Sequence, residues 1–125
     1  MFLRRLLVFA LPALCLMSAS GAALAHAHLK ASDPEKNAKV KAAPSHISLT
    51  FSEPIELSFS AVTITAPDKA EIKTGALSHG KESDDHVVDA PVTIPDTAGT
   101  YSVNWRVLSK DGHKMKGSYQ FSIAP

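Results

Sequence analysis

Apolar and polar residues alternate in four stretches of the chain after residue 45. Such a period of two predicts β-strands that bury one face and expose the other. The longest stretch places four apolar side chains on one face, namely Tyr101, Val103, Trp105 and Val107. We therefore expect strands at residues 47–52, 60–65, 100–109 and 116–123.

Three weaker alternating runs, at residues 27–31, 71–77 and 86–92, bring the expected number of strands to about seven. No window has a convincing helical period with capping residues. Short strands at regular spacing, separated by proline and glycine, predict an all-β domain. We expect a seven-stranded Greek-key β-barrel or sandwich of immunoglobulin-like size. The wholly polar segment at residues 78–85 is expected to be a solvated loop.

Residues 1–25 have the three parts of a secretory signal peptide. Arg4 and Arg5 provide the positive start, residues 6–17 form an uncharged apolar run, and Ala23-Leu24-Ala25 matches a cleavage site. The apolar run is shorter than the roughly 20 residues that span a bilayer. We therefore expect no permanent anchor, a mature domain at residues 26–125, and export to the periplasm. Cys15 would be discarded with the signal peptide.

Composition narrows the function of the expected mature domain. Without Arg4 and Arg5, 11 basic residues stand against 12 acidic ones, a balance that gives no electrostatic footprint for nucleic acid. The domain contains no cysteine, and all six histidines fall within it. Histidine and carboxylate side chains are therefore the strong metal ligands that it offers, together with one thioether, Met115.

His26 would become the new amino terminus after cleavage. The α-amine and Nδ1 of one terminal histidine can close a chelate ring on a metal, and both nitrogens lose their protons near neutral pH at modest cost. With a third nitrogen from a distant histidine, the set is tetragonal, which suits Cu(II) better than zinc. The alternative is that a histidine stands at this position by accident of the cleavage site.

Two further motifs carry candidate ligands. Asp111 and His113 are two residues apart, so in an extended chain both side chains point to one face, and Gly112 between them lets the backbone bend. The alternative is an ordinary Asp-Gly turn. Glu53 ends a strand before Pro54 and is either a further carboxylate ligand or simply solvated.

In combination, these motifs resemble the CopC family of periplasmic copper-binding proteins, especially its short stand-alone members. The resemblance rests on His26-Ala27-His28-Leu29, Phe51-Ser52-Glu53, the run from Gly99 to Ser109, and Asp111-Gly112-His113, in that order. It implies a Greek-key β-barrel that holds Cu(II) at one end. It also implies ligation by the amine and imidazole of His26, by His113 and by Asp111, with Glu53 as a further carboxylate in some members.

The sequence departs from relatives that hold Cu(I) in a methionine-rich loop. The matching stretch, residues 66–85, contains no methionine, and Met115 lies too close to the Asp111 motif to build such a site. Cu(I) requires thioether or thiolate ligands. We therefore expect one Cu(II) per chain and no Cu(I) site.

The remaining histidines have alternative interpretations. His28, the third mature residue, could wrap Cu(II) with two deprotonated backbone amides, but this would pull the first strand from its sheet. His46 is expected at the surface, and His79 and His86 flank the polar loop, where they offer a secondary site.

The leading hypothesis is a monomeric periplasmic Cu(II)-binding protein, not an enzyme, that sequesters copper or delivers it to a transporter. Because no apolar span follows the domain, a transporter would be a separate chain, and the resemblance suggests a CopD-type inner-membrane copper permease. Two other classes stay open. One is a copper-dependent oxidative enzyme with a two-histidine site, which Asp111 and the scarcity of aromatic residues disfavour. The other is a metal-free β-sandwich interaction module.

Overall fold

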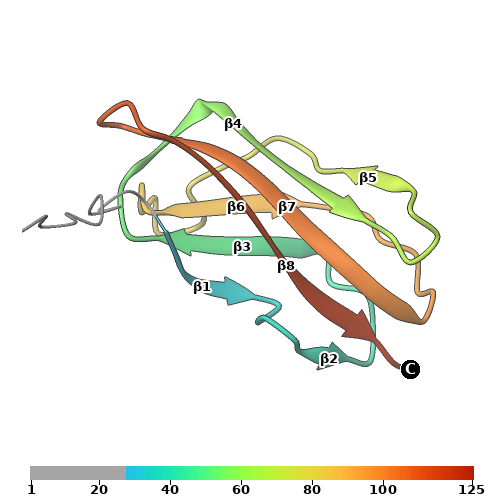
Figure 1. The fold of residues 1–125 in the computed structure, drawn as a ribbon. Coiled ribbons are helices and arrows are strands. Elements are labelled where there is room, and N and C mark those ends of the chain that lie inside the picture. The colour runs from blue at the N-terminus through green and yellow to red at the C-terminus, as the bar shows by residue number, and fades with distance from the viewer. Residues whose placement is uncertain (1–27) are drawn as a thin grey trace, which may run out of the picture.

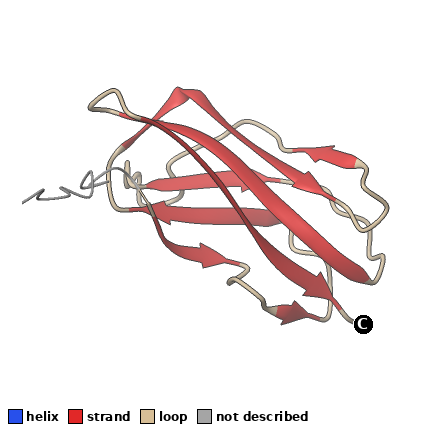
Figure 2. Ribbon diagram, in the orientation of Figure 1, coloured by secondary structure: helices blue, strands red, loops and turns tan. Residues whose placement is uncertain are grey.

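Strands make up all of the regular structure in residues 28–125, the part of the chain that the computed structural model describes (Figure 2). The strands are β1 (Leu29–Asp33), β2 (Lys39–Val40), β3 (His46–Phe51), β4 (Ile55–Thr65), β5 (Glu71–Lys73), β6 (Val87–Pro91), β7 (Gly99–Ser109) and β8 (Lys114–Ile123). The all-β prediction is therefore confirmed. No helix within the described range is long and apolar enough to cross a membrane.

The strands form two sheets that face each other (Figure 1). One sheet has the order β1-β3-β6, and the other has the order β2-β8-β7-β4-β5. Neighbouring strands are antiparallel except for β2 and β8. Strand β7 returns after a long connection to lie beside β4, as in a Greek-key arrangement. The result is a sandwich of the kind that the alternation predicts.

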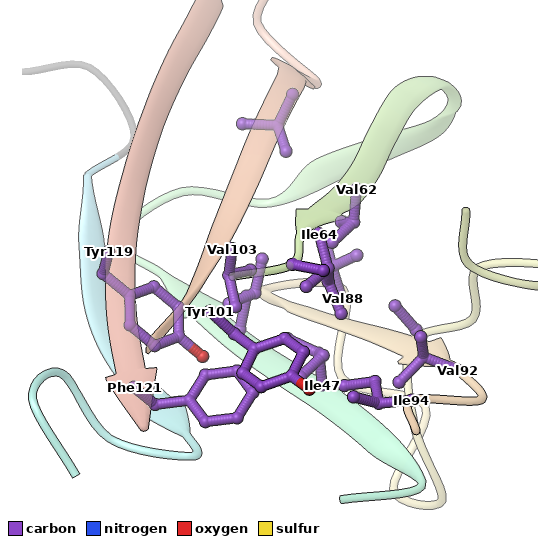
Figure 3. Close-up of a cluster of buried hydrophobic side chains, with 14 of the residues drawn as sticks. Ile47, Val62, Ile64, Val88, Val92, Ile94, Tyr101, Val103, Tyr119 and Phe121 are labelled. Atoms are coloured by element: carbon purple, nitrogen blue, oxygen red, sulfur yellow. The ribbon is translucent and has the colours of Figure 1, made fainter. Parts of the chain in front are cut away.

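The core lies between the two sheets, as Figure 3 shows. The three-stranded sheet contributes buried side chains such as Ile47 and Val88, and the five-stranded sheet contributes Ile64, Tyr101 and Phe121. The rings of Tyr101 and Phe121 stack with their centroids 5.6 Å apart and their planes 13° apart. Tyr101 and Phe121 lie on the face that the alternation assigns to the core, so the predicted inward face is confirmed for β7 and β8.

Trp105 lies on the same inward face of β7 and is half-buried. Its indole ring contacts Phe51 edge-on at 6.2 Å and Tyr119 at the same centroid distance. It also covers Gly117 on β8, where an added Cβ atom would lie 2.3 Å from the ring. Burial raises the pKa of Tyr119 to about 12.

The expected count of seven strands is wrong for the described residues, which contain eight. Strand β2 is only two residues long, too short to produce a visible alternation. The strand expected at 60–65 begins earlier, at Ile55, because a bulge between Glu56 and Ala61 reverses which residues face inward. The strand expected at 71–77 ends at Lys73, because the chain then turns toward β6, where the amide of Gly75 donates to the carbonyl of Pro91 over 2.7 Å.

Three segments meet at one end of the sandwich, on the left in Figure 1. They are the β7–β8 turn, the β3–β4 turn at residues 52–54, and the beginning of β1. The chain entering β6, at residues 84–86, reaches the same end, where the amide of Ile55 donates to the carbonyl of Asp85 over 2.8 Å. This end therefore brings together the segments that carry the candidate ligands.

Candidate metal centre

The β7–β8 turn carries Asp111 and His113. Two backbone hydrogen bonds close it: the amide of Gly112 donates to the carbonyl of Ser109, and the amide of Ser109 donates to the carbonyl of His113, both over 2.9 Å. Gly112 has a φ of 94°, a value that side chains with a Cβ atom rarely adopt. The expectation that Gly112 lets the backbone bend here is confirmed.

The bend brings the two candidate side chains into contact. Nδ1 of His113 lies 3.0 Å from Oδ1 of Asp111, and both side chains are about half exposed to solvent. The motif therefore forms a solvent-accessible pair of side chains of the two types, imidazole and carboxylate, that bind metal ions. Hydrogen bonding from Ser109, and then from His113, holds the pKa of Asp111 below its ordinary value.

Ser109 organises this pair from inside the sandwich. Its side chain is 1% exposed, and its hydroxyl donates to Oδ1 of Asp111. The same hydroxyl accepts a hydrogen bond from the amide of His113 over 3.1 Å. One buried oxygen therefore contacts both residues of the pair, a role that the sequence analysis did not assign.

This arrangement determines which atoms would bind a metal. Oδ1 of Asp111 and Nδ1 of His113 face each other, so Oδ2 of Asp111 and Nε2 of His113 are the second ligand atoms of the two side chains. A carboxylate on the second ring nitrogen is the usual device that orients a ligating histidine and raises its basicity. Asp111 therefore fits either of two roles, as a direct ligand or as the partner that orients His113.

Glu53 lies on the β3–β4 turn, across from the Asp111 turn. The amide of Lys110 donates to the carbonyl of Pro54 over 2.9 Å, and Ile55 pairs with Ser109. These contacts place the backbone of Glu53 next to the hairpin. However, Glu53, Asp111 and His113 do not form a group of described residues whose ligand atoms all lie within 4.8 Å of one another.

His28 marks the start of the described chain at this same end. Its amide donates to Oγ of Ser52 over 3.0 Å, and its carbonyl accepts from the amide of Ser52 at the same distance. Binding of Cu(II) through deprotonated amides would consume that amide, which argues against the wrapping mode for His28. His26 and the signal peptide expected at residues 1–25 lie outside the described residues, so both stay predictions.

A second group of metal-binding side chains lies nearby, in Asp84, Asp85 and His86. Nδ1 of His86 is 3.1 Å from Asp84 and 3.2 Å from Asp85. Hydrogen bonds from His86 lower the pKa of Asp84, and the hydrogen bond from Lys110 lowers that of Asp85. The sequence analysis placed both aspartates in a solvated loop. The unbroken run Asp84-Asp85-His86 was the signal that could have identified this group.

Lys110 connects the two clusters. Its Nζ lies 3.1 Å from Oδ2 of Asp85, while its neighbour Asp111 belongs to the hairpin pair. The ammonium group already neutralises one carboxylate of the Asp84 group. The hairpin pair has no such cation on its carboxylate within residues 28–125, so it is the better candidate for a metal ion.

The other two described histidines lie on the outer side of the three-stranded sheet. Nδ1 of His46 is 3.1 Å from Asp89, and Nδ1 of His79 is 2.9 Å from the carbonyl of Val87. Both line a shallow hollow of about 410 Å³ with Asp84. His46 is exposed, as expected.

The comparisons with known proteins decide the family. The CopC domain matches residues 29–124 of the chain. The chain belongs to the CopC family. Protein YobA of Escherichia coli strain K12 is 43% identical over 99 residues, which are 79% of each chain. Copper resistance protein C of Xanthomonas campestris pv. juglandis is 35% identical over 117 residues, covering 84% of this chain and 85% of that protein.

Solved structures of the CopC family have the same fold. CopC from Methylosinus trichosporium OB3b superposes with a TM-score of 0.69 and 25% identity, covering 80% of this chain and 95% of that one. PcoC from Escherichia coli, described as a methionine-rich copper resistance protein, gives a TM-score of 0.66 and 30% identity, covering 80% and 100%. The predicted resemblance is confirmed.

Proposed function

We propose that this CopC-family chain is an exported Cu(II)-binding protein that sequesters copper in the periplasm or delivers it to a transporter. The observation that carries the proposal is the Asp111–His113 pair, held on a rigid turn at the end of the sandwich where the described chain begins. Copper as the metal is supported by relatives that are named copper resistance proteins.

His26 supplies two nitrogens in this proposal. His28 is fixed at Ser52, and covalent geometry keeps the Cα atom of His26 within about 7.6 Å of that of His28. The terminal amine and imidazole of His26, together with His113, give three nitrogens in a tetragonal set, which favours Cu(II). Asp111 adds an anionic oxygen, and Glu53 is the nearest further carboxylate on the chain.

The proposed cargo is one Cu(II) ion per monomer. Residues 66–85 carry no methionine, and Met115 stands alone next to the hairpin, so a thioether site for Cu(I) is not part of the proposal. The proposed recipient is a separate inner-membrane copper permease of the CopD type.

The oxidative enzyme is the main rival, and the placement of the aromatic residues disfavours it. Copper enzymes with a two-histidine site that act on polysaccharides need an aromatic surface for the sugar chain. Tyr101 and Tyr119 are buried in the core, and Trp105 covers Gly117, so none of them forms such a surface. Asp111 would also stabilise Cu(II) against the reduction that oxygen chemistry needs. The copper-loaded protein should therefore not produce peroxide continuously when ascorbate and oxygen are supplied. Sustained peroxide formation would establish the enzyme instead.

The deciding experiment is electron paramagnetic resonance of Cu(II) bound to the chain that starts at His26, compared with the same chain carrying one extra N-terminal residue. We expect the extra residue to change the nitrogen hyperfine pattern and to weaken binding, because it removes the α-amine from the site. His113→Ala should weaken binding in either chain. His46→Ala, on the outer side of the other sheet, is the matched control and should change nothing.

Two results would contradict the proposal. No Cu(II) binding by the chain that starts at His26 would refute the function. An identical spectrum and affinity with the extra residue would remove the amine of His26 from the ligand set while leaving copper binding in place.

A further inference from the structure

A groove of about 620 Å³ runs along the outer face of the five-stranded sheet, directly beside the Asp111–His113 turn. Residues from three neighbouring strands line it, including Phe59 on β4, Leu108 on β7, and Met115 on β8. Leu108 and Lys114, which both line it, immediately flank the turn. We call this feature the Phe59 groove.

Phe59 forms one wall of the groove, and it is 73% exposed, the largest exposure of a big apolar side chain within residues 28–125. It lies in the bulge of β4, between Glu56 and Ala61. A bulge commonly redirects a side chain away from the regular face of a sheet. Phe59 is therefore directed into solvent, where a large apolar group gains nothing unless something covers it.

Hydrogen bonds make this bulge a fixed feature. Oγ of Ser60 donates to the carbonyl of Glu56 over 2.8 Å and accepts from the amide of Leu108 over 3.1 Å. The side chain of Ser60 therefore links the bulge of β4 to the neighbouring strand β7. It also satisfies a backbone amide that the bulge leaves without a partner on β4. The position of Phe59 beside the groove is built into the sheet.

The rim of the groove is positively charged. Arg106, Lys114 and Lys116 line it, all three are exposed, and none forms an ion pair with another residue in the described part of the chain. Glu56 faces the same side, opposite Leu108, but it does not line the groove. An apolar wall under three unpaired cations is complementary to an apolar side chain flanked by carboxylates.

We propose that the Phe59 groove docks a segment of a partner protein in which an apolar side chain stands between acidic residues. Docking there would place the partner against the Asp111–His113 turn. In this respect the proposal rests on the proposed function, because the partner is then the protein that exchanges copper with this turn.

The shape of the surface favours a protein segment over two other occupants. A bilayer surface is met by a protruding apolar face, whereas this feature is concave. Within residues 28–125, a second copy of the chain offers one exposed large apolar side chain, Phe59, and this residue lies beside the cations of the groove itself rather than between carboxylates.

The test is a titration of the metal-free chain starting at His26, followed by amide chemical shifts in NMR. The probe is a short synthetic peptide with two phenylalanines between glutamates. We expect salt-sensitive shifts confined to residues 59–61, 106–108 and 114–116. Phe59→Ser and Arg106→Glu should each weaken binding by about tenfold. Lys73→Glu, on the far edge of the same sheet, is the matched control and should bind as the parent does.

The other outcomes would overturn the proposal. These are absent shifts, shifts elsewhere, equal binding of a peptide with glutamine in place of glutamate, the same shifts with phosphatidylglycerol vesicles, and concentration-dependent dimerisation through the groove. Because the titration contains no copper, it is independent of the proposed function. A chain that binds the peptide but not Cu(II) would refute the proposed function and leave the docking surface standing.

Discussion

Ser109 is the residue on which the geometry of the candidate centre most depends. The replacement Ser109→Ala removes the hydroxyl that donates to Asp111 and accepts from the amide of His113. Loss of such a positioning contact typically lowers metal affinity by about 10- to 100-fold. We expect a drop in that range in a competitive Cu(II) titration, together with a changed electron paramagnetic resonance spectrum.

A purely structural role for Ser109 would give a different result. In that case Ser109→Ala would lower the unfolding temperature but leave the spectrum of bound Cu(II) as in the parent. Ser109→Thr keeps the hydroxyl and should restore most of the affinity if the hydrogen bonds are what matter. Failure of the threonine variant to exceed the alanine variant would contradict the positioning role.

The pH dependence of copper binding separates the carboxylate from the nitrogens. The pKa of Asp111 is lowered by Ser109 and His113, so this group stays ionised well below neutral pH and its charge is lost only as the pH falls through that lowered value. Ordinary imidazoles and terminal amines take up protons near pH 6.5 and 8. We expect Cu(II) affinity to fall by at least about a hundredfold from about pH 7.5 to about pH 5.5.

The variant Asp111→Asn is the control for that pH dependence. Its affinity should be lower at every pH, but a large fall between the two pH values should remain, because the competing protons go to nitrogen. A flat profile in the parent would exclude ligation by an amine and two imidazoles.

At the scale of elements, the alternation predicted β7 and β8 well because their inward and outward residues keep one phase from end to end. It failed in β4, where Ile55 and Val62 both face the core. Their positions differ by an odd number, so a regular strand would place them on opposite faces. The bulge that carries Phe59 absorbs the difference. A pattern with period two cannot reveal a bulge, because the extra residues look like the end of a strand.

Gly117 is the element-scale feature that a substitution tests directly. It lies opposite Trp105, and an added Cβ atom would lie 2.3 Å from Cζ2 of that ring. The indole, held between Phe51 and Tyr119, has little room to move. We expect Gly117→Ala to lower the free energy of unfolding by about 1–3 kcal/mol in a urea titration.

Ser118→Ala is the matched control for Gly117, one position along β8 and exposed. It should change the unfolding free energy by less than about 0.5 kcal/mol. A neutral Gly117→Ala variant would mean that Trp105 can leave its place over β8 without cost.

At the scale of the whole molecule, the motif Asp111-Gly112-His113 was predictable because its residues are close in sequence. Ser109 was within reach too, since it continues the inward face of β7 as a polar residue at an apolar position. The run Asp84-Asp85-His86 was visible in the sequence as well, but its link to Lys110 was not predictable, because the fold brings together residues 25 positions apart. Sequence spacing carries no information about such a contact.

The two clusters at this end of the sandwich make a final prediction about stability. A ligand that binds only the folded state stabilises it by about 2.7 kcal/mol at a hundred times its Kd, which for a domain of this size raises the unfolding temperature by about 10 °C or more. We expect Cu(II) to produce such a shift in calorimetry, and we expect Asp111→Asn to reduce it. The double variant Asp84→Ala with His86→Ala should keep the full shift, because Lys110 already occupies that group. The reverse pattern would place the copper ion at residues 84–86, since the variant that loses the shift identifies the cluster that holds the metal.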